Sequence, residues 1–292
     1  SAAGAYSQFP RTSVFEANQI LNITGGPYAH ENYRASTQVV YLNKVPTSQY
    51  RAVGHPIGNT VGESLVDQAA AACGIDPMEF RRRNVMRDDS YPRVSAAGIE
   101  MRDLSHQKCL ETLVERMGYD ALLEEQAEYR KKGIQRGIGI AAFIKGTAPG
   151  PAGYYGAGGA PISSQDSCTI KLEPSGGVIC MVGVTDQGQG VDTVMGQIAA
   201  ATLGVPMESV RVIEGDTDAV PYGGGTYASR ATAIGGEATY QAAMLLRAEI
   251  LEIAGVLLQA EPDTLDIVDG HVVDKGDTAS RISLAEIGRI GH

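Results

Sequence analysis

Glycine is unevenly distributed along this chain, and its distribution limits the folds open to the sequence. Of the 36 glycines among 292 residues, 20 lie between residues 138 and 236, separated by short β-branched runs. They show no three-residue period, and 43% of the residues are hydrophobic, so the chain is neither collagen-like nor disordered. Glycine tolerates backbone angles that other residues avoid. This segment is therefore expected to carry sharply turned loops on a packed core.

Length and charge narrow the class of protein. A chain of 292 residues fits two lobes or one large α/β unit. Its 34 acidic and 24 basic residues give a net charge of -10, whereas a protein that reads a phosphate backbone normally needs a basic face. No run of about eighteen apolar residues occurs, and the first residues lack the pattern of an export signal. We expect a cytoplasmic protein that binds neither nucleic acid nor a membrane.

Metal-binding and common catalytic motifs are missing from the sequence. The four cysteines, Cys73, Cys109, Cys168 and Cys180, form no CxxC pair, which predicts reduced, buried thiols and no zinc or iron–sulfur site. The five histidines have no ligand spacing, and neither GxSxG nor HExxH occurs. Residues 61–64 (Val-Gly-Glu-Ser) run directly into a helical pattern and are interpreted as structural. No protein side chain is predicted to bind a metal.

Local patterns predict helices for most of the first half. Strands are expected at 37–42 and 48–53, followed by a helix at 59–72 that Gly74 closes. Asp76 and Pro77 are typical of the start of another helix, as N-cap and first-turn proline. From residue 76 to 137, dense charges and apolar residues at helical spacing predict helices that face solvent.

The second half alternates strands and helices. The pattern predicts a strand at 139–144, a hairpin of 167–172 with 178–184, a helix at 191–203, a strand at 209–214, a buried helix at 237–258, a hairpin of 264–268 with 271–273, and a helix from 283. The whole chain is expected to have an α+β (mixed α/β) fold, with helices packed on mixed sheets.

The sharpest motif is Asp-Gln-Gly-Gln-Gly at residues 186–190, between a predicted strand and a predicted helix. Glycines let a ligand approach the backbone, and free N–H groups at the start of a helix favour an anion such as phosphate. The amides of Gln187 and Gln189 supply donors and acceptors, which suits a polar heterocycle better than a metal. The alternative is a plain tight turn.

Two further motifs are candidates for a binding site. Residues 221–230 contain three consecutive glycines, hydroxyl groups and Arg230, which together offer the donors that a phosphate would use. The alternative for this segment is a flexible surface loop. Residues 50–55 place Arg51 in a predicted apolar strand, where the alternative is a surface arginine in a salt bridge.

Taken in chain order, these motifs resemble those of a known family. Residues 50–54, 74–81, 186–190, 204–206 and 215–230 are similar to motifs in the molybdenum-binding large subunit of the xanthine dehydrogenase and aldehyde oxidase family. The resemblance spans nearly the whole chain, and the combination of motifs is specific although each alone is not. It implies a molybdopterin-binding fold in two partial lobes, at 1–136 and 137–292. The implied cofactor is molybdopterin with molybdenum, commonly as the cytosine dinucleotide in bacterial members.

The resemblance also assigns site residues by position. It implies that the pterin or the molybdenum contacts Gln187, Gly188, Gln189 and Gly190, and that the pterin and its phosphates contact Gly225, Thr226, Tyr227, Ala228, Ser229 and Arg230. Arg51 would lie beside the molybdenum in the substrate pocket, with Ala52 next to the cofactor. The family's carbon monoxide dehydrogenases have a cysteine directly after that arginine, so Ala52 implies a different reaction.

The implied reaction is hydroxylation of an aldehyde or an aromatic N-heterocycle with oxygen from water. Electrons would leave through 2Fe-2S clusters and FAD on an iron–sulfur subunit and a flavin subunit, because this chain has no cysteine pattern for clusters. The remaining part of the molybdenum subunit would complete the site, in a dimer of such heteromers. The family's catalytic glutamate belongs to a later segment without a counterpart here, so the chain alone is expected to be inactive.

Two other functions stay open at this point. One is a non-catalytic scaffold or assembly module that keeps the fold and has lost the cofactor. The other is an independent nucleotide-binding enzyme, which would bind a nucleotide with this chain alone.

Overall fold

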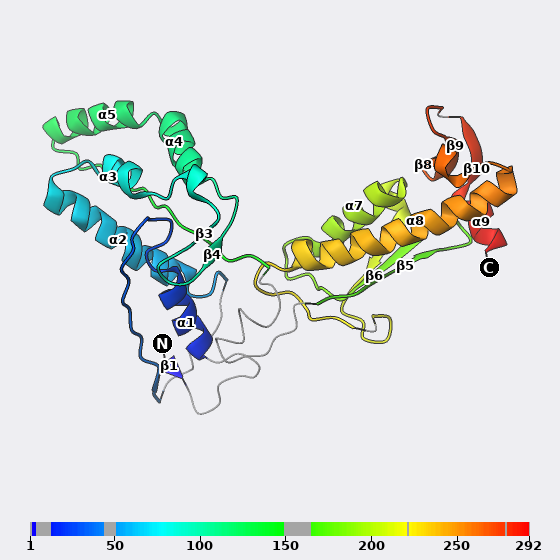
Figure 1. Cartoon of the computed structure of the whole chain (residues 1–292), viewed down its shortest axis with the longest axis horizontal. Coiled ribbons are helices and arrows are strands. Elements are labelled where there is room, and N and C mark those ends of the chain that lie inside the picture. Colours follow the sequence, from blue (N-terminus) through cyan, green and yellow to red (C-terminus); the bar gives the residue numbers. More distant parts are fainter. Residues whose placement is uncertain are drawn as a thin grey trace. The chain divides into compact units, whose positions relative to one another are not determined.

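The computed structural model describes residues 2–3, 13–43, 51–148, 165–220, 222–277 and 279–291. They form two compact units, here called unit 1 (up to Lys145) and unit 2 (from Gly146), and each is described by itself (Figure 1). Both units combine helices with small sheets, which confirms the predicted α+β class. The division of the lobes between residues 136 and 137 stays a prediction.

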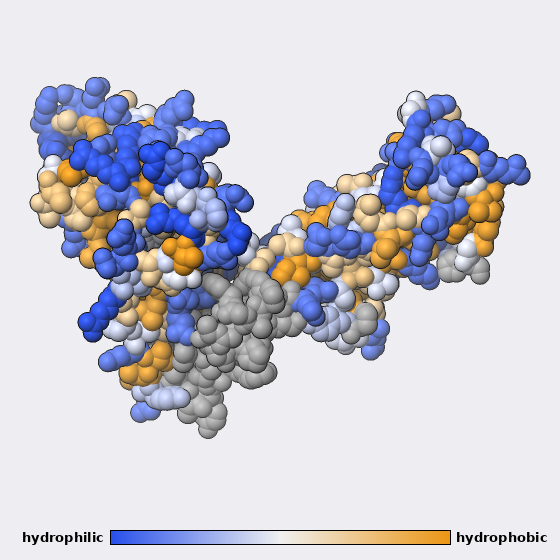
Figure 2. Space-filling view, in the orientation of Figure 1, coloured by the Kyte–Doolittle hydropathy of each residue, from blue (hydrophilic) through white to orange (hydrophobic). Residues whose placement is uncertain are grey.

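Unit 1 is mainly helical. Its helices are α1 (Ser13–Ile23), α2 (His55–Cys73), α3 (Pro77–Asn84), α4 (His106–Met117) and α5 (Tyr119–Lys131), with a 3-10 turn at Asp88–Ser90. Its sheets pair β1 (Ala2–Ala3) with β2 (Val40–Tyr41) in parallel, and β3 (Arg93–Val94) with β4 (Glu100–Met101) antiparallel. Hydrophilic residues cover α4 and α5, as predicted for this charged segment (Figure 2).

The junction between α2 and α3 follows from local chemistry. Gly74 ends α2 in the left-handed conformation, with φ 65°. The Asp76 carboxylate then accepts the N–H groups of Met78 and Glu79 at 2.9 and 3.0 Å, which caps α3. Both predicted helix boundaries are confirmed, although α2 begins at His55, before the predicted start.

Three predicted strands of unit 1 need correction. Residues 139–144 form no strand, because side chains take their backbone groups: Arg81 donates to the Ile140 carbonyl at 2.9 Å, and the Ala142 N–H donates to Glu63 at 3.0 Å. The predicted strand at 48–53 is wrong at residues 51–53, which form a turn into α2, while residues 48–50 lie outside the described residues. The strand expected at 37–42 is reduced to β2.

A buried ion pair holds α2 and α3 together. Arg81 is fully buried, and its Nε and Nη2 atoms donate to Glu63 Oε2 at 3.0 and 2.8 Å. The Tyr28 hydroxyl donates to Glu63 Oε1 at 2.7 Å, and burial, together with this carboxylate, raises the pKa of Tyr28. Both oxygens of Glu63 are therefore in use. This supports the structural interpretation of residues 61–64, because the buried carboxylate is bound to Arg81 and Tyr28 within unit 1.

Unit 2 is built on a three-stranded sheet in the order β5 (Cys168–Leu172), β6 (Val178–Val182) and β7 (Val210–Ile213). β5 and β6 form the predicted antiparallel hairpin, whereas β6 and β7 run parallel and are connected through α7 (Val191–Leu203). α7 packs on β7 and on α8 (Gly236–Leu258), and α8 also covers β5 (Figure 1). The predicted strands and both helices are confirmed.

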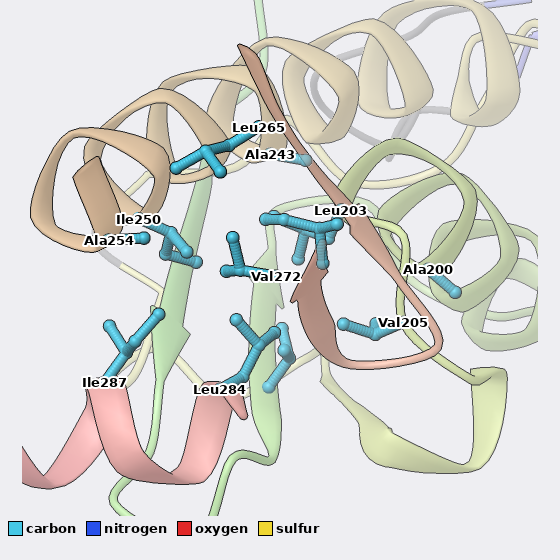
Figure 3. Packing of buried hydrophobic residues seen from close by; sticks show 12 residues of the cluster. Ala200, Leu203, Val205, Ala243, Ile250, Ala254, Leu265, Val272, Leu284 and Ile287 are labelled. Atoms are coloured by element: carbon cyan, nitrogen blue, oxygen red, sulfur yellow. The ribbon is translucent and has the colours of Figure 1, made fainter. Parts of the chain in front are cut away.

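A second antiparallel sheet follows α8. It orders β10 (Ser280–Ser283), β9 (His271–Asp274) and β8 (Leu265–Val268), and α9 (Leu284–Ile290) comes next. Figure 3 shows the core that this sheet shares with both long helices, which includes Leu203, Ile250, Leu265, Val272 and Leu284. Gly204 ends α7 so close to β8 that a Cβ there would lie 2.0 Å from the Ile267 carbonyl oxygen. Only glycine fits this position.

The cysteines differ in burial. Cys73 and Cys109 are exposed, so the prediction of buried thiols is wrong for both, because each lies on the solvent side of its helix. Cys180 is buried and Cys168 partly buried, with their sulfur atoms 3.6 Å apart, and all four thiols are free. Among the described helices, none carries an apolar stretch long enough to cross a bilayer.

The Arg81–Glu63 pair gives a test of unit 1. Arg81→Ala leaves a buried carboxylate without its cation and is expected to lower the free energy of unfolding by about 3–5 kcal/mol, measured with urea. Arg82→Ala is the matched control, because the side chains of Arg82 and its partner Glu111 are 35% and 49% exposed. Such surface pairs contribute about 1 kcal/mol or less. Equal losses in the two variants would contradict the role given to Arg81.

Candidate functional site

The 186–190 loop connects β6 to α7, as the sequence predicts, but its backbone is arranged differently. Asp186 Oδ1 accepts the N–H groups of Gln189, Gly190 and Val191 at 3.1, 2.9 and 3.2 Å. The expectation that free N–H groups at the start of α7 bind an anion is therefore wrong for these three groups, because the carboxylate occupies them. The bond from Val191 contributes most to lowering the pKa of Asp186.

The side-chain amides of Gln187 and Gln189 are exposed, and each uses one of its two polar atoms in a bond between or within the loops. Gln187 Nε2 donates to the Thr226 carbonyl at 2.9 Å, and Gln189 Oε1 accepts the Gln187 N–H at 2.6 Å. Gln187 Oε1 and Gln189 Nε2 take part in neither bond. The loop therefore presents one acceptor and one donor at its surface.

The second glycine-rich segment is described from residue 222, since Pro221 lies outside the described residues. Thr226 Oγ1 accepts the Thr185 N–H at 2.9 Å, directly before the 186–190 loop. Gly183 and Gly223 approach so closely that a Cβ on Gly223 would lie 2.5 Å from the Gly183 Cα atom. These contacts bring the 186–190 and 222–230 loops together. The two segments are about forty positions apart in sequence, so only tertiary packing brings them into contact.

Arg230 lies at the end of the 222–230 loop, and its side chain is buried inside unit 2. Its side chain is 1% exposed and forms an ion pair with Asp166, whose side chain is fully buried, at 2.7 Å. The same guanidinium donates to the carbonyls of Gly225 and Gln165 and lies 5.0 Å from the centre of the Tyr227 ring. This arrangement gives Arg230 a part in shaping the loop. A direct contact between Arg230 and a phosphate stays a prediction.

Two residues beside Arg230 have unusual backbone angles. Ala228 and Ser229 have φ values of 49° and 59°, in the left-handed region that L side chains rarely adopt. Surrounding contacts must stabilise such a conformation, and strained residues of this kind gather at ligand sites.

Arg51 and Ala52 belong to unit 1. Both are exposed in the turn before α2, where Ala52 has φ 55° and its carbonyl accepts the His55 N–H at 2.8 Å. Gly54 packs against α1, where a Cβ would lie 2.8 Å from the Glu16 carbonyl oxygen. The structure thus brings together the predicted residues of unit 2 and leaves these two in the other unit.

Sequence reasoning missed two residues of this site. Glu214, directly after β7, accepts the Asp186 N–H at 2.9 Å, and Asp166 holds Arg230. Glu214 could have been found, since β6 and β7 are parallel strands whose carboxyl ends lie together, where ligands commonly bind. Asp166 had no local signal. Among the described residues, no group of three or more His, Cys, Asp or Glu side chains could hold a metal ion.

Comparison with known proteins identifies the family. Residues 112–291 match the model of a molybdopterin cofactor-binding domain, and residues 1–85 match a second model of the same description. The chain belongs to the molybdopterin cofactor-binding domain family. Its relatives include large and molybdenum-binding subunits of hydroxylases and dehydrogenases, among them a xanthine dehydrogenase, which confirms the resemblance that the motifs predicted.

Several relatives support this assignment. The chain is 32% identical to the nicotine 6-hydroxylase large subunit of Paenarthrobacter nicotinovorans, over 97% of this chain and 35% of that protein. It is 31% identical to the carbon monoxide dehydrogenase large chain of Hydrogenophaga pseudoflava, over 97% of this chain and 36% of that protein. Quinoline 2-oxidoreductase from Pseudomonas putida 86 matches with a TM-score of 0.85 and 32% identity, over 99% of this chain and 36% of that chain. The chain thus spans about a third of these relatives.

The two loops of unit 2 fit a molybdopterin. A Cβ on Gly188, Gly190 or Gly225 would meet nothing within 4 Å beyond its own chain neighbours, so the backbone is open to a flat ring. The free acceptor and donor of Gln187 and Gln189 lie on the same loop and match the mixed polar edge of a pterin. These loop residues could hold the cofactor.

The buried pair of unit 2 can be tested by removing Arg230. Arg230→Ala leaves Asp166 buried without its cation and is expected to lower the free energy of unfolding by about 3–5 kcal/mol, measured with urea. Arg211→Ala on β7 is the control, because Arg211 is exposed and its loss should change stability by less than about 0.5 kcal/mol. A loss below about 1 kcal/mol for Arg230→Ala would contradict the role of the pair.

The three backbone N–H groups that Asp186 accepts predict that the stability of the fold depends on pH. The pKa of Asp186 is lowered in the folded chain, so the ionised carboxylate stabilises the fold above the ordinary value of about 3.9. This contribution is lost as the pH falls through the lowered pKa. Asp186→Asn keeps a capping acceptor that does not titrate. The difference in Tm between the unmodified chain and this variant should therefore shrink between pH 7 and about pH 3. A constant difference would exclude Asp186 as the titrating group.

Proposed function

We propose that this chain holds the molybdopterin of a molybdenum hydroxylase that oxidises an aldehyde or an aromatic N-heterocycle with oxygen from water. The observation that carries the proposal is the pair of loops joined through Thr226, with exposed glutamine amides and open glycine backbone. Bound there, the cofactor would supply the two-electron oxidation of substrate. The part of this chain is to bind the cofactor and fix its orientation.

The polar atoms of Gln187 and Gln189 that take no part in the loop bonds give each residue a role in this proposal. Gln189 Nε2 donates to the cofactor, and Gln187 Oε1 accepts from it, while Gly188, Gly190 and Gly225 leave room for the ring. Thr226 holds the two loops in register. Tyr227, Ala228 and Ser229 line the same loop, and Arg230 supports it from behind.

Substrate class and partners belong to the same proposal. Arg51 contributes to the substrate pocket, and Ala52, in place of the cysteine of carbon monoxide dehydrogenases, favours an organic substrate. Nicotine 6-hydroxylase and quinoline 2-oxidoreductase are named for aromatic N-heterocycles, which supports this class. We infer partners that carry 2Fe-2S clusters and FAD, the cytosine dinucleotide form of the cofactor, and a cytoplasmic location.

The decisive variant is Gln189→Ala. It removes the donor toward the cofactor and the acceptor of the Gln187 N–H, both on an exposed side chain, so the assembled enzyme should fold normally and lose molybdenum and hydroxylase activity, each by roughly tenfold. Metal analysis and pterin fluorescence of the purified complex measure the loss. Gln197→Ala is the matched control, an exposed glutamine on α7 that should leave both readouts unchanged.

The same measurements separate the proposal from its alternatives. Unchanged molybdenum in Gln189→Ala would reject the assignment of this loop. An assembled complex that contains neither molybdenum nor pterin would instead favour the scaffold or assembly module.

A further inference from the structure

Two buried side-chain atoms of the described residues lack a hydrogen-bond partner: Glu214 Oε2 and Arg230 Nε. Nearly all buried polar groups in native proteins are paired, so each exception needs an explanation. Both exceptions lie on the segments that build the candidate site, since Glu214 bonds to the 186–190 loop and Arg230 closes the 222–230 loop. Their concentration there indicates that a bound group completes the site.

Glu214 is the better placed of the two to meet a ligand. Its Oε1 atom accepts the Asp186 N–H at 2.9 Å, which fixes the first residue of the 186–190 loop. Its Oε2 atom is closed off from solvent and receives no donor. A buried carboxylate oxygen without a donor costs free energy that a bound donor would recover.

We propose that Glu214 is a cofactor-positioning residue, whose Oε1 atom holds the 186–190 loop while Oε2 accepts an N–H group of the bound pterin. The contact is direct or passes through one ordered water. It rests on the proposed function, since it assumes that the pterin lies on this loop. A charged acceptor makes the stronger kind of hydrogen bond, so this contact would orient the ring and not merely attract it.

Glu214→Gln separates this role from a structural one. The amide keeps an oxygen for the Asp186 N–H but replaces Oε2 with an NH₂ group, which cannot accept a pterin N–H. In the assembled complex from a host that makes no molybdopterin, removal of the unpaired charge should raise the apparent Tm by about 2–4 °C. In the loaded complex, retention of molybdenum and pterin through dialysis should fall roughly tenfold. The two changes have opposite signs, which a structural residue would not produce.

Two further variants complete the test. Glu208→Gln changes an exposed carboxylate just before β7 and should move neither readout. Glu214→Ala also removes the acceptor of the Asp186 N–H, so it should lower cofactor retention without the gain in Tm.

Retention equal to that of the unmodified complex in Glu214→Gln would overturn the inference, and so would a parallel fall in Tm and retention. If Gln189→Ala loses molybdenum while Glu214→Gln does not, the positioning role fails and the proposed function stands. If neither variant loses molybdenum, the proposed function fails as well.

Discussion

The buried pair of Arg230 and Asp166 is the contact on which the candidate site depends. It stabilises a loop that contains three consecutive glycines and two residues with left-handed backbone, which have little intrinsic preference for one conformation. The guanidinium joins Asp166, just before β5, to a loop that is distant in sequence. Thr226, in the loop held by Arg230, then accepts a hydrogen bond from Gln187 in the 186–190 loop.

Unit 1 also contains a buried pair of an arginine and a carboxylate, but with different surroundings. Arg81 and Glu63 are also a buried pair, but their remaining bonds go to Tyr28, Asp67 and the backbone of residues 140–142. This network is saturated, whereas unit 2 leaves one oxygen of Glu214 and one nitrogen of Arg230 unpaired. This contrast supports the proposed positioning role of Glu214.

Elements with strong local signals could be predicted from the sequence. α7 between Val191 and Gly204, the β5–β6 hairpin, and the start of α3 at Asp76 all follow from periodicity, turn residues and caps. The sequence could not show that the strand predicted at 139–144 is wrong, because the backbone of this segment bonds to side chains of α2 and α3, which are distant in sequence. The anion site expected at α7 failed for a similar reason, since Asp186 occupies the N–H groups first.

The sequence by itself determined which residues are available: glycines and amides in two loops, in an order that identifies the family. Only the tertiary structure decided what each of them does. Tertiary packing buries the Arg230 side chain and joins Gln187 to Thr226. It also places Glu214, which no motif had marked, beside Asp186. Local patterns carry backbone preferences, whereas hydrogen-bond partners that are far apart in sequence are set by how the sheet and helices pack.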